Sequence, residues 1–204
     1  MARLAAESEL GSGERPPPLR RNGGGGQGIE PIYLSSYVEF MRAEAYMALG
    51  DTGNAALHFE AGITESIAKV LSFGSLDANA DTSLMPDEVT VSEFIDYQVD
   101  AFNAAPTTST LDGFGFPTQK DKMDILGEQY FVALFGGGND AYNFIRRTGY
   151  PRTVSRNIEA LPGPFPRTFL YPSDEINTNP NVQQRTNNTT QVFWDSGVVV
   201  IPSN

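Results

Sequence analysis

Few side chains in this sequence are suited to acid–base or nucleophilic chemistry. His58 is the only histidine, and cysteine is absent from the 204 residues. A histidine-dependent triad, a multi-histidine metal site and a thiolate nucleophile therefore cannot be built from this chain. Asp124 and Glu128 would share one helix face, where two carboxylates could hydrolyse a glycoside. Because many acidic proteins carry such pairs, we interpret this one as a solvated helix face and expect no catalytic residue and no enzyme.

An acidic segment has part of the spacing of a calcium-binding loop. Asp77, Asn79, Asp81 and Glu88 occupy positions one, three, five and twelve of that loop, and their oxygen atoms would suit a hard cation. Thr82, however, stands where the sharp turn of the loop requires glycine, and a proline stiffens the chain just before the last ligand. We therefore expect a solvated acidic loop with no metal and no cofactor, and calcium binding is the alternative.

Aromatic side chains offer the only ligand-binding candidates. Phe114 and Phe116 flank Gly115 in a loop predicted between Ala104 and Pro117. Rings exposed on such a loop could stack on the faces of a sugar, whereas buried rings that close a helix junction would have the same sequence. We favour packing and keep ligand stacking at Phe114 and Phe116 as the alternative.

The elements that would position these residues are predicted to be helices. Their ranges are 33–49, 54–72, 90–104, 119–135 and 139–147. The first two are joined by a tight turn at Gly50, and their small and aromatic residues are spaced as in a tetratricopeptide unit. Because one such unit cannot bury its own faces, we expect neighbouring units upstream. The fold class is therefore predicted to be mainly α, with a tetratricopeptide-like helix pair and further helices.

Apolar spacing and polar caps fix the expected helix faces and starts. The predicted apolar stripes are Leu34, Val38, Met41, Ala45 and Leu49 in the first helix; Val91, Ile95, Val99 and Phe102 in the third; and Met123, Leu126, Tyr130 and Leu134 in the fourth. The predicted caps are Asn54 for the second helix, a capping box of Thr90 and Glu93 for the third, and Asn139 for the fifth, which follows the glycine break at 136–138.

Two adjacent arginines close the fifth predicted helix. Arg146 and Arg147 would complement the negative end of the helix dipole, but successive helical residues point about 100° apart and cannot share one role. We infer that one turns inward, where it would bind backbone carbonyls of the irregular tail or a carboxylate, with Asp174 and Glu175 the nearest acidic candidates. The other is expected to stay in solvent.

The chain beyond Pro151 has few helical signals and many prolines. It is predicted to form a long irregular segment, rich in proline and asparagine, that lies on a surface. Its expected aromatic anchors are Phe169, Tyr171, Phe193 and Trp194.

Composition excludes some partners. A formal net charge of -11 argues against nucleic acid, because binding the phosphate backbone requires a basic face. No run of about 18 apolar residues is present that could span a bilayer. Residues 1–28 combine proline, glycine and charge, and are predicted to be a disordered low-complexity leader to a helical domain at 29–204.

A set of short motifs in the second half of the chain resembles the SusD/RagB family of outer-membrane lipoproteins. The motifs are Ala133 to Gly136, Asp140, Tyr142, Arg146 to Pro151, Arg167, Tyr171 with Pro172, Asn177 to Asn181, and Trp194 with Asp195. In that family a helix ends in ALFG and is followed by an acidic residue, an aromatic residue, RRTGYP, a YP dipeptide, an asparagine-rich stretch and a final W-D. The same place in the order favours Trp194 as a packing anchor, with a carbohydrate contact as the alternative.

The resemblance implies a helical, non-catalytic binding protein with tetratricopeptide helix pairs as scaffold. Such proteins lie on the outer face of the outer membrane, capture oligosaccharides or in some members peptides, and deliver them to a TonB-dependent, SusC-like transporter. Their only membrane contact is a lipid on a cysteine, which this chain lacks, so we expect the chain to be the C-terminal portion of a larger protein. The residues alone leave open a second hypothesis, a tetratricopeptide-type protein or peptide-binding scaffold.

Overall fold

The protein is mainly helical, as the sequence predicts. The computed structural model describes residues 32–76, 81–155 and 163–197. Its helices are α1 (Ser35–Ala48), α2 (Thr52–Ser72), the 3-10 helix η2 (Phe73–Leu76), α3 (Glu88–Ala104), α4 (Lys122–Ala133), α5 (Gly138–Thr148) and α6 (Ser173–Thr178). In these ranges no strand is formed, and the only β-type pairing is an isolated antiparallel bridge between Leu111 and Pro117.

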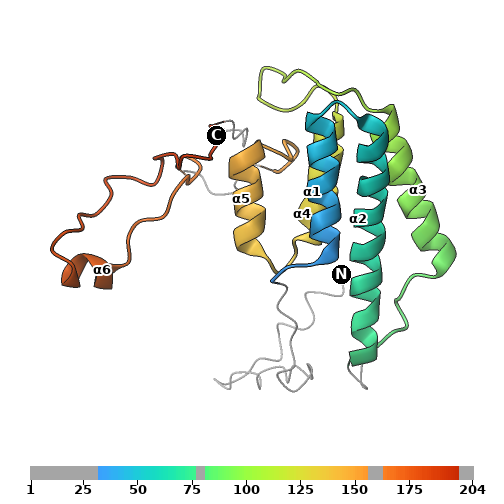
Figure 1. Cartoon of the computed structure of the whole chain (residues 1–204), viewed down its shortest axis with the longest axis horizontal. Coiled ribbons are helices and arrows are strands. Elements are labelled where there is room, and N and C mark those ends of the chain that lie inside the picture. The colour runs from blue at the N-terminus through green and yellow to red at the C-terminus, as the bar shows by residue number, and fades with distance from the viewer. Residues whose placement is uncertain (1–31, 77–80, 156–162, 198–204) are drawn as a thin grey trace, which may run out of the picture.

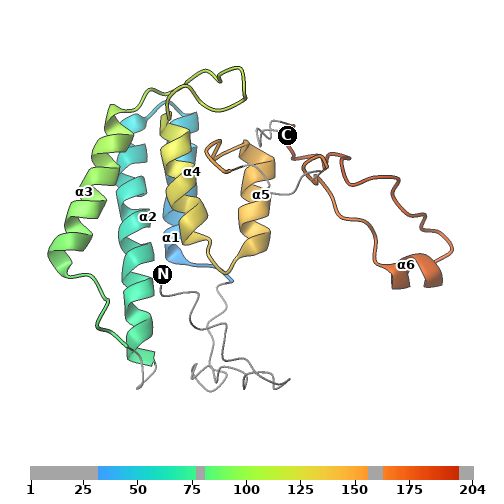
Figure 2. The ribbon, with the colours of Figure 1, turned by 180° about the vertical axis from the view of Figure 1, so that it is seen from behind.

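The helices α1 to α4 form a bundle, with α5 beside it and α6 far from it (Figures 1 and 2). Residues 163–197, which we call the arm, extend away from the bundle and carry α6 at their far end (Figure 1). The leader at 1–28 and the calcium-loop positions Asp77 and Asn79 lie outside the described residues. None of the described helices is both long and apolar enough to cross a membrane.

The bundle is built around a chain of aromatic contacts. Phe40 of α1 stacks on Tyr130 of α4, with ring centroids 5.2 Å apart. Phe59 of α2 stacks on Phe102 of α3 at 4.8 Å, and Phe144 of α5 meets Tyr130 edge-on at 5.0 Å. Because these rings are almost fully buried, each removes a large apolar area from water, and together they join five helices.

The prediction for the buried face of α1 is wrong, because the buried positions are shifted by about one residue from the predicted ones. Its buried positions are Ser36, Tyr37, Phe40 and Ala43, and the side chains of the predicted stripe are half-buried or exposed, with Leu49 79% exposed. The two aromatic rings decide the rotation of the helix, because they contact Tyr130 of α4 and bury more area than the smaller aliphatic groups. The stripes of α3 and α4 agree better, since Phe102, Leu126, Tyr130 and Leu134 are all buried.

The helices α2 and α3 begin at aspartates, and α5 begins at a glycine, rather than at the predicted caps. Asp51 caps α2 and accepts the backbone N–H of Asn54 at 3.1 Å, and Asp87 caps α3 and accepts the backbone N–H of Thr90 at 2.7 Å. These hydrogen bonds lower the pKa of both aspartates. The caps predicted at Asn54, Thr90 with Glu93, and Asn139 are therefore wrong, because an aspartate three residues earlier holds the first two amides and α5 begins after Gly137 without a side-chain cap.

The turns use glycine where the prediction placed it. Gly50 between α1 and α2, Gly136 after α4 and Gly149 at the end of α5 have φ angles of 77°, 92° and 76°. This left-handed conformation is strained for residues with a Cβ atom. The breaks that separate the helices are therefore fixed by local sequence.

Candidate functional site

Arg146 of α5 lies where the arm meets the bundle. Its guanidinium is stacked between two aromatic rings, 4.1 Å from the ring centroid of Tyr142 and 4.5 Å from that of Trp194. It donates hydrogen bonds to the backbone carbonyl of Arg167 and, at 2.6 Å, to Oδ1 of Asn143. The prediction of an inward-turned arginine that binds a tail carbonyl is confirmed. Trp194 packs against Arg146, in agreement with its predicted role as an anchor.

The prediction that Asp174 or Glu175 binds the inward arginine is wrong. Asp174 and Glu175 are exposed in the first turn of α6, at the far end of the arm (Figure 1). The acidic partner at the junction is Asp195, which binds Nη1 of Arg167 at 2.5 Å and is itself fully buried at its side chain. The arm folds back on itself, so the residues at its two ends meet and its middle lies away from the bundle.

Arg147, expected in solvent, is exposed and also forms an ion pair with the bundle. Its two terminal nitrogens donate to the two carboxylate oxygens of Glu44 on α1, one of them at 2.8 Å. The side chain of Arg147 is 44% exposed, and the hydrogen bonds that it donates to Glu44 raise its pKa. Sequence reasoning missed this pair because Glu44 lies 103 residues upstream and carries no local signal.

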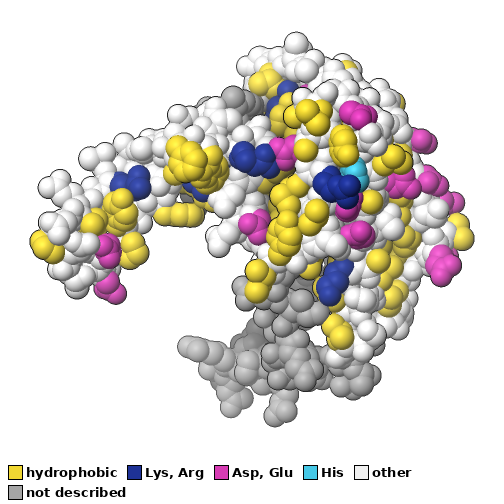
Figure 3. Space-filling view, viewed as in Figure 1, with side chains coloured by type: hydrophobic (Ala, Val, Ile, Leu, Met, Phe, Trp, Pro, Cys, Tyr) yellow, Lys and Arg dark blue, Asp and Glu magenta, His cyan; other side chains and the backbone are white. Residues whose placement is uncertain are grey.

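A small cavity lies beside these arginines. It has a volume of about 290 Å³ and is bounded by Met41 of α1, Tyr130 of α4, several residues of α5 and Trp194 of the arm. The α5 side chains that line it are Asp140, Asn143, Phe144 and Arg147. Figure 3 shows this side of the molecule, where charged side chains lie next to hydrophobic ones over α1 and α5. Aromatic, carboxylate and amide groups thus converge on one concave site.

The motifs that meet at this junction are those of a known family. A family model described as "SusD-like: Susd and RagB outer membrane lipoprotein" matches residues 30–195. The chain belongs to this family. Comparisons with curated proteins and with solved structures gave no match.

Two of the SusD-like motifs are separated in sequence and adjacent in space. Arg146 and Arg147 come from the RRTGYP motif, and Trp194 with Asp195 comes from the closing W-D. They are brought together because α5 presents one arginine to the arm and the other to α1. The described contacts of these motifs are internal to the protein.

The other carboxylate candidates form a structural network. Asp124 is completely buried and accepts hydrogen bonds from the backbone and Nε nitrogens of Arg152, both at 3.1 Å. Nη2 of the same arginine lies 2.6 Å from Asp121, which receives a further bond from Tyr150 at 3.2 Å. Burial raises the pKa of Asp121, and the hydrogen bonds that Arg152 donates to Asp124 raise the pKa of Arg152. The cluster fixes the start of α4 against the segment after α5.

The solvated-face interpretation of Asp124 and Glu128 is wrong for Asp124. Arg152 compensates its charge in the interior, and Asp121 and Asp124 also form a reciprocal capping box at the start of α4. Glu128 binds Nζ of Lys120 at 2.7 Å and accepts a hydrogen bond from Thr153. The D-x-x-D spacing before an apolar run was the sequence signal for this cap.

The Phe114 loop stands at one end of the bundle, between α3 and α4 (Figure 1). Oδ1 of Asp112 accepts the backbone N–H groups of Phe114 and Phe116 at 2.8 and 2.9 Å, and Gly115 has a φ of 85°. Phe114 is 74% exposed and Phe116 is half-buried. The loop is thus held in a defined turn with one ring outward, and ligand stacking there stays a proposal.

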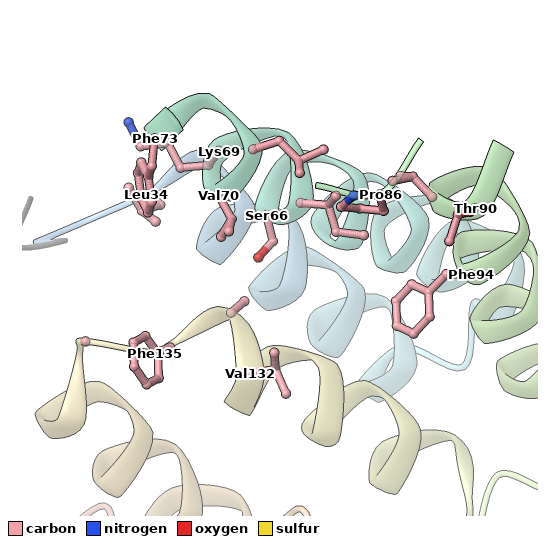
Figure 4. Close-up of a pocket in the computed structure, with 15 residues that line it drawn as sticks. Leu34, Ser66, Lys69, Val70, Phe73, Pro86, Thr90, Phe94, Val132 and Phe135 are labelled. Carbon is pink, nitrogen blue, oxygen red and sulfur yellow. The ribbon is translucent and has the colours of Figure 1, made fainter. Parts of the chain in front are cut away.

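An apolar groove of about 580 Å³ opens between the end of α2, the start of α3 and the end of α4. Figure 4 shows Val70 and Phe73 on one side, Phe94 on α3, and Val132 and Phe135 on the other side. Phe135 is 91% exposed and Val132 67%. This groove is large enough to contact another apolar segment. Lys69 is the only charged residue that lines it, in contrast to the Trp194 cavity.

The described residues contain no group of three or more histidine, cysteine, aspartate or glutamate side chains placed to hold a metal ion. Of the calcium-loop positions, Asp81 caps a turn by accepting the backbone N–H of Ser83 at 2.9 Å, and Glu88 lies in the first turn of α3. Calcium binding by the whole loop stays an untested alternative, since its first two ligands lie outside the described residues.

Proposed function

We propose that this chain is the C-terminal helical portion of a cell-surface protein that binds glycans or other nutrients and delivers them to a TonB-dependent, SusC-like transporter in the outer membrane. The observation that carries this proposal is the SusD-like family match over residues 30–195. The family description as an outer membrane lipoprotein supports a location on the outer membrane.

We further propose that the protein binds without chemistry. Asp124 and Glu128, the carboxylates that could serve a glycosidase, are both engaged in ion pairs, and Asp124 is buried. A general acid and a base would need access to a glycosidic bond held between them. Asp124 instead caps the start of α4 and binds Arg152, and Glu128 binds Lys120.

The test is calorimetric titration of the full chain with a panel of neutral oligosaccharides and short peptides, together with an assay for new reducing ends. Saturable binding of oligosaccharides without cleavage is the expected result. Cleavage that disappears in Glu128→Gln would overturn the non-catalytic proposal. Binding only of peptides would favour the tetratricopeptide-type scaffold, for which the apolar groove offers a surface.

Delivery to a transporter needs a separate measurement. We expect the full-length protein to co-purify with an outer-membrane TonB-dependent transporter from its own cells after mild detergent extraction. Recovery from the outer-membrane fraction without any such transporter would contradict the delivery step and leave ligand binding intact.

A further inference from the structure

The cavity beside Trp194 has the size of a site for one small ring. Its volume of about 290 Å³ is near the lower limit of ~300–1,000 Å³ that is usual for small-molecule pockets. Tyr130 of α4, which is only 6% exposed, lies at its inner side, and Trp194 of the arm forms another wall. The site thus depends on the contact between bundle and arm.

Two polar groups of α5 face this cavity with hydrogen-bonding capacity unused. The side-chain carboxylate of Asp140 forms no hydrogen bond and no ion pair with any described residue. Asn143 accepts from Arg146 through Oδ1, and its Nδ2 group makes no bond within the described ranges. The two residues are three apart on a helix and therefore lie side by side. An acceptor and a donor are thus offered together, which matches adjacent hydroxyl groups, since each hydroxyl both donates and accepts.

The aromatic wall of the cavity is held in place from behind. Arg146 stacks on Trp194 at 4.5 Å but does not line the cavity, so the part of Trp194 that does is left for another contact. A tryptophan fixed in this way presents a flat apolar surface at little conformational cost on binding. The apolar face of a sugar ring would fit such a surface.

The charge balance of the site favours a neutral ligand. Arg147, the cation in its wall, is already bound by both oxygens of Glu44. A terminal carboxylate of a peptide would therefore have to compete with Glu44, and it would also lie close to Asp140. A sugar hydroxyl meets neither penalty.

We propose that this cavity is a subsite for one neutral sugar ring, which stacks on Trp194 and binds through its hydroxyls to Asp140 and Asn143. The inference rests on the proposed function, that the protein binds glycans, and names a place where one residue of the glycan is held. Arg147, whose charge is compensated by Glu44, forms one wall of the subsite.

Trp194 is the only tryptophan, so tryptophan fluorescence reports on this cavity and on the contact of the arm with the bundle. The experiment titrates the full chain with methyl glycosides of glucose, galactose and mannose, and measures the emission of Trp194. Asp140→Asn removes the carboxylate with little change of shape. Asn143→Asp keeps the oxygen that accepts from Arg146 and removes the Nδ2 donor. Asp174→Asn is the matched control, because that carboxylate is exposed on α6.

We expect a saturable change of Trp194 emission with at least one glycoside, unchanged in Asp174→Asn and weakened by about tenfold or more in Asp140→Asn and in Asn143→Asp, since a hydrogen bond to a charged group contributes roughly this factor. Far-UV circular dichroism checks that the variants keep their helices. Equal affinity of the wild type and both cavity variants would overturn the inference. So would a response to dipeptides with none to sugars.

The oligosaccharide titration separates this inference from the proposed function. If oligosaccharides bind the wild type and the Asp140→Asn and Asn143→Asp variants equally, the glycan site lies elsewhere, so the subsite is wrong and the proposed function stands. If the wild type binds no oligosaccharide and no methyl glycoside, the subsite and the glycan part of the proposed function are both wrong.

Discussion

The interactions that stabilise the bundle differ from those that attach the arm to it. All buried hydrophobic side chains among the described residues lie between Tyr37 and Ile145, in the bundle and α5. In the described part of the arm, Thr168 is the only buried residue, and Phe193 is fully exposed. The arm is instead attached to α5 by the stack of Trp194 on Arg146 and by the hydrogen bond from Arg146 to the backbone carbonyl of Arg167. The ion pair of Arg167 with Asp195 holds the two ends of the arm together.

This contrast corrects the predicted anchors of the tail. Of the aromatic residues expected to bury themselves, Phe169 and Phe193 are largely exposed, and only Trp194 is well covered. Phe169 still contacts Tyr142, with ring centroids 5.3 Å apart. Burial of apolar area stabilises a region in proportion to that area, so the bundle should unfold as one unit and the arm should detach at a lower free energy.

The largest expected effect is on the bundle. Arg152→Ala would leave Asp121 and Asp124 buried without their cation, which costs about 3–5 kcal/mol of unfolding free energy. Urea denaturation followed by far-UV circular dichroism measures this loss. Lys120→Ala is the matched control, because its ion pair with Glu128 is half exposed and contributes at most ~1 kcal/mol. Similar losses in the two variants would show that the buried network does not hold α4.

A second prediction separates the arm from the bundle. Because Trp194 is the only tryptophan, its emission follows the arm, whereas circular dichroism follows the helices. We expect the fluorescence transition in urea to precede the helical one. Arg146→Ala should lower the free energy of arm opening by about 1.5–3 kcal/mol, the usual range for hydrogen bonds from a charged group, and leave the helical transition nearly unchanged.

Arg147→Ala is the comparison for that variant. The partner of Arg147, Glu44, lies on α1, and the Arg147 side chain is 44% exposed. Loss of this ion pair should therefore cost at most ~1 kcal/mol of unfolding free energy and should not shift the fluorescence transition to lower urea. Coincident fluorescence and dichroism curves in the wild type would contradict the distinction between arm and bundle, since they would indicate a single cooperative unit.

The smallest expected effect is a dependence on pH within the bundle. A hydrogen bond with His58 lowers the pKa of Glu39 below its ordinary value of 4.5. The ionised carboxylate therefore contributes stability that is complete above pH 4.5 and is lost as the pH falls through the lowered value. In Glu39→Gln, we expect the loss of stability between pH 6 and pH 3 to be smaller than in the wild type by a few tenths of a kcal/mol. An equal acid dependence in both proteins would rule out this contribution.

Much of the helical framework could be predicted from the sequence because its signals are local. Glycine at 50, 136 and 149 separates the helices, and apolar spacing places each predicted helix within a few residues of its observed bounds. α6 was not predicted, since a helix of six residues between prolines has no periodic pattern to recognise. The SusD-like motifs were also readable, because they depend on order along the chain.

The candidate site could be predicted only in part, because its contacts join residues far apart. Sequence alone showed that Arg146 and Arg147 must point in different directions. Only the tertiary structure decided that Arg146 meets a carbonyl 21 residues ahead and that Arg147 meets Glu44 on α1, 103 residues back. Helix propensity and periodicity act over one or two turns, whereas the partner of a side chain is chosen by how whole helices pack. The cavity beside Trp194 exists only once that packing is made.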